Sequence, residues 1–282
     1  MLSIFTIPKP FQGHNNIIQT NAIQSWLKLH PRCEIILFGN DDGVAETAKE
    51  LGVKHIPSIE KNEFGTPLLS SVFSSAQKLA ENDILMYANA DIIFFQDLIE
   101  AVRRVDISSF LMCGRRWDLD VKEEIDFENK QWNEELLDKV KNNGKPHGLS
   151  GMDYFVFPRS TIDMPGFAVG RPGWDTWLIY NMRSRRLPVI NATDAITVVH
   201  QNHDFSHSKF GGTKRVEGPE WQRNIDIAGG LTNMMTLRDA DWVLSKNGLK
   251  RPDFLARIFS MLSLFFPWRV LLALKRKLQN MR

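Results

Sequence analysis

Three groups of polar residues interrupt or follow apolar runs of the sequence. The first is Asn89-Ala90-Asp91, which breaks an otherwise apolar stretch between residues 83 and 95. A carboxylate at such a break lies at the mouth of a core, where Asp91 could bind a metal ion or a metal-bound phosphate. The second group surrounds Asp175, and the third is the histidine-rich run from His200 to His207.

The elements that must position these residues follow from hydrophobic periodicity. In the first half, strands are predicted at 2–7, 34–38, 54–56 and 83–95, and helices at 16–29, 44–51 and 68–80. Alternating strands and helices build an α/β fold around a mostly parallel sheet. Such sheets bind ligands beyond the carboxyl ends of their strands, and Asp91 falls at such an end.

The second half has a looser pattern, typical of a mixed sheet with long loops. Strands are predicted at 110–115, 153–158, 188–190 and 195–200, and helices at 134–141 and 174–185. Neither a repeat nor a low-complexity linker divides the chain. We therefore expect one domain over residues 1–242 and a separate tail over 243–282.

The composition narrows the function classes. The chain has 282 residues, of which 43% are hydrophobic, enough for a full core. Its two cysteines, Cys33 and Cys113, have no CxxC spacing, which argues against a disulfide framework and a thiolate zinc site. The sequence contains neither GxGxxG after the first strand nor a P-loop. Phosphates would have to be bound in another way, and a metal-bridged diphosphate is the natural alternative.

The run Tyr87-Ala88-Asn89-Ala90-Asp91-Ile92-Ile93-Phe94 resembles the DxD motif of nucleotide-sugar glycosyltransferases of the GT-A fold. The resemblance implies a Mn²⁺ or Mg²⁺ ion on the donor diphosphate, with Asp91 in the metal-binding position. Asn89 stands where the first Asp usually does and supplies a neutral amide instead of a charge. The alternative is that Asp91 caps the following helix.

The same resemblance gives a role to Asp175 in Gly170-Arg171-Pro172-Gly173-Trp174-Asp175-Thr176-Trp177. GT-A enzymes commonly have an acidic residue at the start of a helix beside the acceptor, and in inverting members it removes the proton of the attacking hydroxyl. Trp174 and Trp177 could stack on a sugar ring, and Arg171 could contact substrate. The alternative for Asp175 is an ordinary helix cap.

Two histidines compete for the remaining metal position. His200 closes an apolar strand and His203 follows three residues later, ahead of Asp204 and His207. Many GT-A enzymes complete the metal shell with a late histidine, and the sequence does not choose between these two. A solvated loop and a zinc site made of these side chains are the alternatives, but neither an HExxH motif nor a cysteine partner supports zinc.

The remaining candidates come from positions that contact substrates in GT-A folds. The resemblance implies nucleotide contacts by the end of the first strand and by the loop after the second, namely Thr6, Pro8, Lys9, Asn40, Asp41 and Asp42. Asp153, in a segment that resembles the acceptor-side segment of the family, could bind a sugar hydroxyl. Arg115, Arg116 and Trp117, which follow a predicted strand, could contact the donor phosphate or sugar. Polar turns and solvated faces are the alternatives for all of them.

The tail differs in charge from the rest of the chain. From residue 246 onward it has nine basic residues and one acidic residue, although the whole chain carries a net charge of only +2. Residues 258–268 form an uncharged stretch that is too short to span a bilayer. Aromatic residues bracketed by cations are typical of an interfacial helix on anionic lipid, and a helix packed on the domain or in a dimer is the alternative. Nucleic acid fits less well, because bulky aliphatic residues are mixed with the basic ones.

We therefore expect a metal-dependent glycosyltransferase that moves a sugar from a nucleoside diphosphate sugar to a hydroxyl of a glycan or lipid-linked acceptor. A sugar-nucleotide nucleotidyltransferase and a non-catalytic glycan-binding protein are the alternatives. The start of the sequence has neither the basic region nor the cleavage site of a signal peptide, so a cytoplasmic protein, peripheral on the inner face of the cell membrane, is expected.

Overall fold

The structure, a computed structural model, describes residues 1–203, 218–253 and 258. Its strands are β1 Leu2–Thr6, β2 Glu34–Phe38, β3 Lys54–Ile56, β4 Ile84–Ala88, β5 Ile92–Phe94, β6 Leu111–Cys113, β7 Trp117–Leu119, β8 Lys145–Pro146, β9 Tyr154–Pro158, β10 Val189–Asn191, β11 Val198–Gln201, β12 Trp242–Ser245 and β13 Gly248–Lys250. Its α-helices are α1 Gly13–Leu27, α2 Val44–Leu51, α3 Leu69–Leu79, α4 Asp97–Arg103, α5 Trp132–Asn143, α6 Trp174–Ser184 and α7 Pro219–Ala228.

Nine of the strands form one large sheet in the order β13-β12-β10-β6-β9-β4-β1-β2-β3. The central strands β4, β1, β2 and β3 run parallel, whereas β9 is antiparallel to both of its neighbours, β4 and β6. The sheet is thus mixed and mostly parallel, as the sequence predicted. Because β1, β2 and β4 are parallel, the residues that follow them lie along one edge of the sheet.

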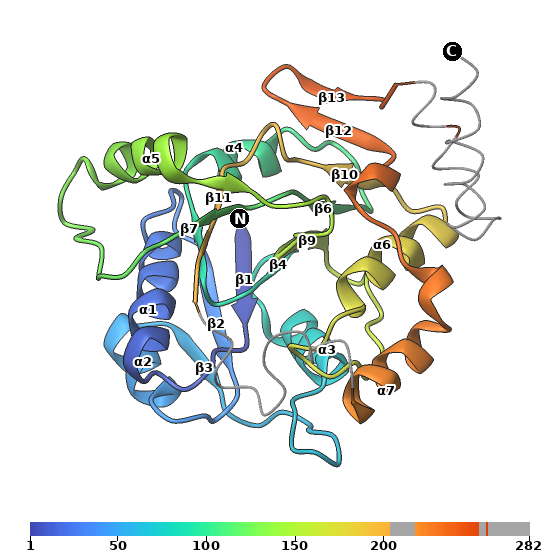
Figure 1. Ribbon diagram of the computed structural model, residues 1–282, viewed down its shortest axis with the longest axis horizontal. Coiled ribbons are helices and arrows are strands. Elements are labelled where there is room, and N and C mark those ends of the chain that lie inside the picture. The colour runs from blue at the N-terminus through green and yellow to red at the C-terminus, as the bar shows by residue number, and fades with distance from the viewer. Residues whose placement is uncertain (204–217, 254–257, 259–282) are drawn as a thin grey trace.

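Helices cover both faces of the large sheet (Figure 1). Leu2 and Ile4 of β1 pack in a core that includes α1, α2 and α4, whereas Phe5 packs with α3 and α6 on the opposite face. This alternation follows from the two-residue period of a strand. Burial on both faces also explains why these strands are continuously apolar.

The other four strands form a second, smaller sheet in the order β5-β11-β7-β8. Strand β5 is antiparallel to β11, and β11 is parallel to β7. A separate apolar cluster joins this sheet to α5, with Ile93, Val199 and Leu136 among its members. The small sheet therefore has its own core.

The apolar run of residues 83–95 is one strand by its hydrophobic pattern but two strands in the structure. Its first part, β4, belongs to the large sheet, and its second part, β5, belongs to the small sheet. The polar segment Asn89-Ala90-Asp91 is where the chain leaves one sheet for the other. The predicted resumption of the strand is therefore corrected to a change of sheet, which the hydrophobic pattern cannot reveal because both strands are buried.

The large sheet extends past the predicted end of the domain at residue 242. Strand β12 begins at that residue and pairs in parallel with β10, and β13 pairs with β12 in turn. Arg251 lies over the ring of Trp242, 3.7 Å from its centre. Most of the predicted tail, residues 254–257 and 259–282, lies outside the described residues.

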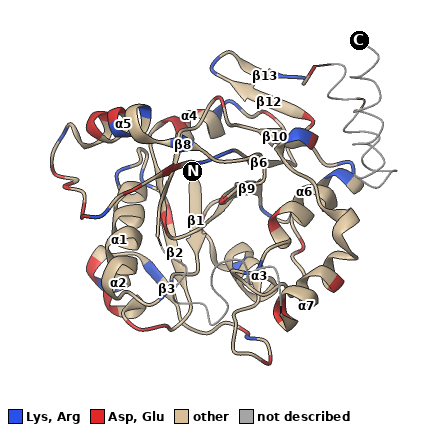
Figure 2. Ribbon diagram, viewed as in Figure 1, with Lys and Arg blue, Asp and Glu red and all other residues tan. Residues whose placement is uncertain are grey.

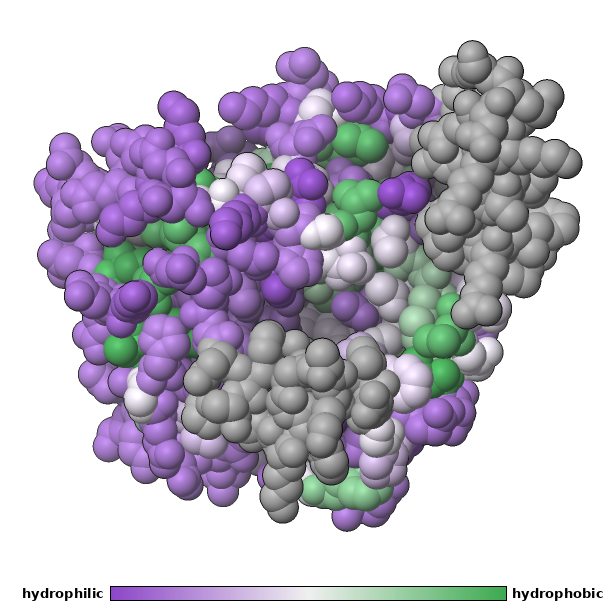
Figure 3. All heavy atoms as spheres, in the orientation of Figure 1, coloured by the Kyte–Doolittle hydropathy of each residue, from purple (hydrophilic) through white to green (hydrophobic). Residues whose placement is uncertain are grey.

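The described helices carry polar outer surfaces. Acidic and basic residues are interspersed on α2 and α5 (Figure 2). Hydrophilic residues also predominate over α1, α2 and α5 on the face seen in Figure 3. None of the described helices has both the length and the apolar character needed to cross a bilayer.

The side chain of Gln201 stabilises the segment where the chain passes from the large sheet to the small sheet, and its substitution tests this role. Its fully buried side chain donates to the carbonyls of Ile18, at 2.7 Å, and Asp91, at 3.2 Å, and accepts from Asn21 at 3.0 Å. Gln201→Ala leaves these buried groups without their partner, so we expect a loss of about 2–4 kcal/mol in the free energy of unfolding. Urea denaturation measures it.

The matched control is Gln222→Ala on the exposed surface of α7, where the Gln222 side chain donates to the Asp226 carboxylate at 2.8 Å. This variant should stay within about 0.5 kcal/mol of the parent protein. Equal losses for both variants would contradict the role of Gln201.

Candidate metal and substrate site

Asp91 lies at the change of sheet, and main-chain hydrogen bonds fix it there. Its carbonyl accepts from the Gln201 backbone N–H at 3.2 Å, which joins it to the end of β11. Asn89 N–H donates to the Asp153 carbonyl at 2.9 Å, which joins the start of the turn to the segment before β9. The side chain of Asp91 is only 13% exposed.

Both predicted histidines lie beside Asp91. Antiparallel pairing places His200 of β11 opposite Ile92 of β5, directly after Asp91. His203 Nε2 lies 3.1 Å from Asp91 Oδ2, and His200 Nε2 lies 3.8 Å from the same oxygen. The structure thus brings together three residues that the sequence proposed as ligands. Asp204 and His207, from the same run, lie outside the described residues.

The electrostatics of this cluster suit a cation. Burial raises the pKa of Asp91, but the hydrogen bond with His203 and the proximity of His200 and Lys9 outweigh it and hold that pKa well below its usual range. Burial is the main cause of a lowered pKa for His200, opposed by Asp91. The result is an ionised carboxylate beside a neutral imidazole, which are the forms that coordinate metals.

The donor atoms also have a suitable arrangement. One ligand atom each from Asp91, His200 and His203 lies within 4.8 Å of the others. Asp91 Oδ1 is buried and has no hydrogen-bond partner among the described residues. Such a buried acceptor requires a partner, and a cation supplies one. One carboxylate and two imidazoles therefore fit a divalent ion such as Mn²⁺.

Asn89 and Asp153 bond each other. The Asn89 amide Nδ2 donates to Asp153 Oδ1 at 2.7 Å. This explains part of the departure from DxD, because the amide group at this position donates a hydrogen bond that a carboxylate could not donate. Asp153 is buried, and its other oxygen accepts from Arg116 Nη1 at 2.6 Å.

Two further residues of the site, Asp118 and His147, had not been singled out from the sequence. Arg116 Nε donates to Asp118 Oδ1 at 2.9 Å, and His147 Nδ1 lies 2.7 Å from Asp118 Oδ2. His200 Nδ1 is 3.4 Å from Asp118 Oδ1. Asp118 lies in the three-residue strand β7, where it stands between Trp117 and Leu119. The signal that could have found it is its place two residues after Arg116, which was itself a candidate from the sequence.

Asp175 lies in the first turn of α6, as predicted. Gly173 precedes the helix with a φ of +116°, a conformation that favours glycine. Burial is the main cause that raises the pKa of Asp175 to about 6, and nearby Asp153 adds to it, although the Thr176 backbone N–H opposes it. Asp175 is thus electrostatically linked to the Asp153–Asn89 pair.

The residues around Asp175 are placed differently from the sequence-based expectation. The indoles of Trp174 and Trp177 are only 7% and 8% exposed. Trp174 packs against Tyr87 and Phe155, and Trp177 packs against Phe167. These contacts give both indoles a packing role in the core, and their stacking on a sugar ring stays a prediction.

Arg171 also has a protein partner. Its guanidinium donates to Glu220 Oε2 of α7 through Nε at 3.0 Å and Nη2 at 2.5 Å. Asn224, also on α7, bonds the N–H and the carbonyl of Ala168. In the structure Arg171 therefore ties the segment before α6 to α7.

The predicted nucleotide-contacting residues lie at the end of β1 and in the segments after β1 and β2, at the edge of the sheet that also carries Asn89. Thr6 Oγ1 is buried and has no hydrogen-bond partner among the described residues. Pro8 is buried and Lys9 is exposed, with the Lys9 backbone held by Gln19 through bonds of 2.6 and 3.0 Å. Asn40, Asp41 and Asp42 are exposed. Their nucleotide contacts stay predictions, as does a substrate contact by Arg115.

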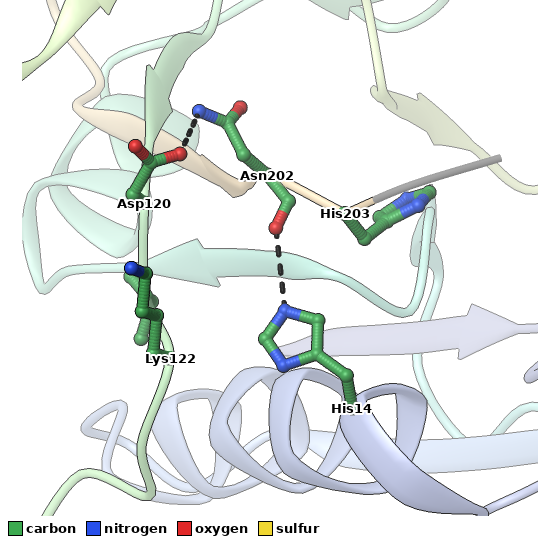
Figure 4. Close-up of a pocket in the computed structure, with 6 residues that line it drawn as sticks. His14, Asp120, Lys122, Asn202 and His203 are labelled. Carbon is green, nitrogen blue, oxygen red and sulfur yellow. Dashed lines mark hydrogen bonds between the residues drawn. The ribbon is translucent and has the colours of Figure 1, made fainter.

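An open cavity of about 490 Å³ lies next to His203 (Figure 4). His14 at the start of α1 lines it, and its Nε2 lies 3.3 Å from the Asn202 carbonyl. Asn202 in turn donates to Asp120 Oδ1 at 2.7 Å. Lys122 adds a cationic side chain to the lining. The cavity therefore places basic groups beside one of the candidate metal ligands.

The cluster predicts a metal-dependent stabilisation. Because a ligand that binds only the folded state raises its stability, Mn²⁺ at about 100 times its dissociation constant should add about 2.7 kcal/mol. Asp91→Asn keeps the side-chain shape but removes the charge, so this gain should disappear. Thermal denaturation across a MnCl₂ titration measures it. Asp106→Asn, at an exposed position, is the control, and an unchanged Mn²⁺ response in Asp91→Asn would contradict the site.

Comparisons with known proteins identify the fold. No protein-family model matches the sequence, and no curated protein does either. Among solved structures, GalNAc-T7 with UDP, GalNAc and Mn²⁺ matches 81% of this chain and 48% of its own, with a TM-score of 0.51 and 15% identity. This chain thus spans about half the length of that protein.

Two weaker matches cover most of both chains. The glucosyl-3-phosphoglycerate synthase of Mycobacterium tuberculosis matches 82% of this chain and 80% of its own, with a TM-score of 0.46 and 12% identity. A putative nucleotide-diphospho-sugar transferase of Desulfovibrio desulfuricans G20 matches 80% and 96%, with a TM-score of 0.45 and 12% identity. On the evidence of the GalNAc-T7 match and of the sheet order, the predicted GT-A fold is confirmed.

Proposed function

We propose that the protein is a metal-dependent glycosyltransferase that moves a sugar from a nucleoside diphosphate sugar to a hydroxyl. The observation that carries the proposal is the position of Asp91 between His200 and His203, at the change from one sheet to the other of a GT-A fold. GalNAc-T7, which shares the fold, binds UDP and Mn²⁺.

Asp91 and one or both histidines would hold Mn²⁺ or Mg²⁺ in this proposal. Bound there, the ion would act as a Lewis acid that stabilises the charge developing on the departing diphosphate. The chain's own basic groups would add to this effect. Lys122 and His14 line the cavity beside His203, and Lys9 is close enough to influence the pKa of Asp91. These side chains would bind and orient the phosphates.

The nucleoside would lie along the edge that follows β1 and β2. Thr6 contributes a buried hydroxyl that has no partner among the described residues, and Asn40 and Asp41 contribute exposed polar groups. Because β1, β2 and β4 are parallel neighbours, this edge leads directly to Asn89 and Asp91. The donor would thus be bound across the carboxyl ends of the central strands.

Asp175 is the proposed general base. It would accept the proton of the acceptor hydroxyl as that oxygen attacks the sugar carbon, which requires the acceptor within hydrogen-bond reach. Its pKa of about 6 leaves it ionised at neutral pH and more basic than an ordinary carboxylate. A base at this position belongs to an inverting transfer.

The sequence of the tail suggests the class of acceptor. We propose a glycan or lipid-linked acceptor, as in surface polysaccharide synthesis, because the tail combines basic with bulky apolar residues in its sequence. That composition suits an anionic membrane surface, to which a protein of this kind would be peripherally bound.

A donor screen tests the function against its two alternatives. UDP-, GDP- and dTDP-sugars with Mn²⁺ should include one donor that raises the melting temperature and is hydrolysed or transferred in a metal-dependent manner. Asp91→Ala should lose turnover by two orders of magnitude or more, because the metal would lose its charged ligand. A nucleotidyltransferase would instead form sugar nucleotide from nucleoside triphosphate, and a binding protein would turn over no donor. Full turnover by Asp91→Ala would overturn the proposal.

Asp175→Asn separates the base from a structural helix cap. The variant should lose about 10²- to 10⁴-fold in transfer while still binding donor. Wild-type transfer should rise with pH through about 6, as Asp175 loses its proton, and the profile of the residual activity in the variant should lack that step.

The same substitution has a stability signature of defined sign. Because burial raises the folded-state pKa of Asp175, the contribution of this residue to wild-type stability falls as pH rises from near 4, the ordinary carboxyl pKa, to about 6. The melting temperature of Asp175→Asn, relative to wild type, should therefore increase across that window. A flat difference would contradict the buried carboxylate.

A further inference from the structure

The imidazole of His200 has one nitrogen toward Asp91 and the other toward Asp118. Nε2 lies 3.8 Å from Asp91 Oδ2, whereas Nδ1 lies 3.4 Å from Asp118 Oδ1. Nδ1 is buried and makes no hydrogen bond to the described residues. A buried polar nitrogen is costly unless it is paired, so a shortening of the Asp118 contact would be favourable.

The sheet register places Asp118 next to His200. Strands β7 and β11 are parallel, and Asp118 is paired with His200 across them. Paired residues on neighbouring strands have side chains on the same face of the sheet. The backbone therefore holds the two side chains together whether or not a ligand is bound.

Asp118 is itself held from two further directions. Arg116 Nε donates to its Oδ1 at 2.9 Å, and His147 Nδ1 lies 2.7 Å from its Oδ2. Because the guanidinium of Arg116 is always charged, its ion pair favours the ionised carboxylate of Asp118, which accepts hydrogen bonds. Each carboxylate oxygen of Asp118 thus has a side-chain contact that restrains its orientation.

A turn over residues 147–151 keeps His147 in place. The His147 N–H donates to the Arg116 carbonyl at 3.0 Å, and the Arg116 N–H donates to the Gly151 carbonyl at 3.4 Å. A side chain at Gly151 would collide with the His147 ring, whereas one at Gly148 would meet nothing within 4 Å. The absence of a side chain at Gly151 therefore permits the contact of His147 with Asp118.

We propose that Asp118 is the positioning residue of His200: it accepts the Nδ1–H of the imidazole and so leaves Nε2 unprotonated and directed at Asp91. The inference rests on the proposed metal site, in which Nε2 would be a ligand. Carboxylates that fix a metal-binding histidine in this way commonly contribute 10- to 100-fold to metal affinity. Arg116 and His147 hold the carboxylate, and Gly151 makes room for His147.

The experiment uses the full chain and two readouts. Electron paramagnetic resonance of unbound Mn²⁺ gives the dissociation constant, and long-range ¹H–¹⁵N correlation of the metal-free protein gives the tautomer of His200, assigned with His200→Gln. The variants are Asp118→Ala and the milder Asp118→Asn, whose amide oxygen can still accept. Asp138→Ala is the control, because Asp138 is exposed on α5, the helix packed on the same small sheet.

We expect the Nδ1–H tautomer of His200 in wild type and a mixture in Asp118→Ala. The Mn²⁺ dissociation constant should rise about 10- to 100-fold in Asp118→Ala and less in Asp118→Asn, with Asp138→Ala unchanged. Gly151→Ala, which displaces His147, should also weaken Mn²⁺ binding, whereas Gly148→Ala should not.

An unchanged tautomer and an unchanged Mn²⁺ affinity in both Asp118 variants would overturn the inference while leaving the metal site intact. If wild type binds no Mn²⁺, the proposed function fails instead. The tautomer of His200 in the metal-free protein then still tests whether Asp118 positions His200. Retention of the Nδ1–H tautomer in Asp118→Ala would overturn that positioning role. Should Asp118→Ala fail to fold, Asp118→Asn provides both readouts.

Discussion

The candidate site depends on the pairing of two short strands, β5 and β11. Asp91 and His203 are separated by 112 residues in sequence and meet only because this antiparallel pair forms. The Gln201 backbone and side chain both bond the Asp91 carbonyl, so the end of one strand fixes the start of the other. Strand pairing is set by main-chain hydrogen bonds and by burial, which makes it more rigid than a loop. Strand pairing thus fixes the backbone positions of Asp91 and His200, and His203 follows two residues after the end of β11.

Burial of so many polar groups would be unfavourable if they had no partners. Arg116 forms ion pairs with Asp118 and Asp153, and the imidazoles of His147 and His203 lie within hydrogen-bond distance of Asp118 and Asp91. Each carboxylate has a protein partner. Ion pairs of this kind contribute little net stability, because desolvation opposes the attraction, but they define geometry. Their value here lies in orientation.

Much of this architecture was predictable, because buried strands and amphipathic helices have strong periodic patterns. Helix α2 and strand β3 have the predicted bounds, and the predicted ligands Asp91, His200 and His203 do meet, since each follows or ends an apolar run. The change of sheet after β4 was not predictable, because the hydrophobic pattern records burial and not the identity of the neighbouring strand.

The side-chain environments were harder to predict than the elements. Arg171 is paired with Glu220, 49 residues away, on a helix that the sequence pattern had not indicated. The indoles of Trp174 and Trp177 could serve a surface or a core equally well, and only packing decides. Asp118 becomes notable only through its register with His200. The roles of Asp175 as base and of the residues after β1 and β2 stay predictions.

The two ion pairs of Arg116 restrict the movement of the two sheets relative to each other. Asp118, one of its partners, lies in β7 of the small sheet, and the other, Asp153, directly precedes β9 of the large sheet. The guanidinium of Arg116 therefore connects the two sheets: it binds a carboxylate in a strand of the small sheet and a carboxylate next to a strand of the large sheet. The sheets cannot slide past each other at this point without stretching one of the two ion pairs. A planar, always charged group is well suited to this task, because its donors have fixed directions.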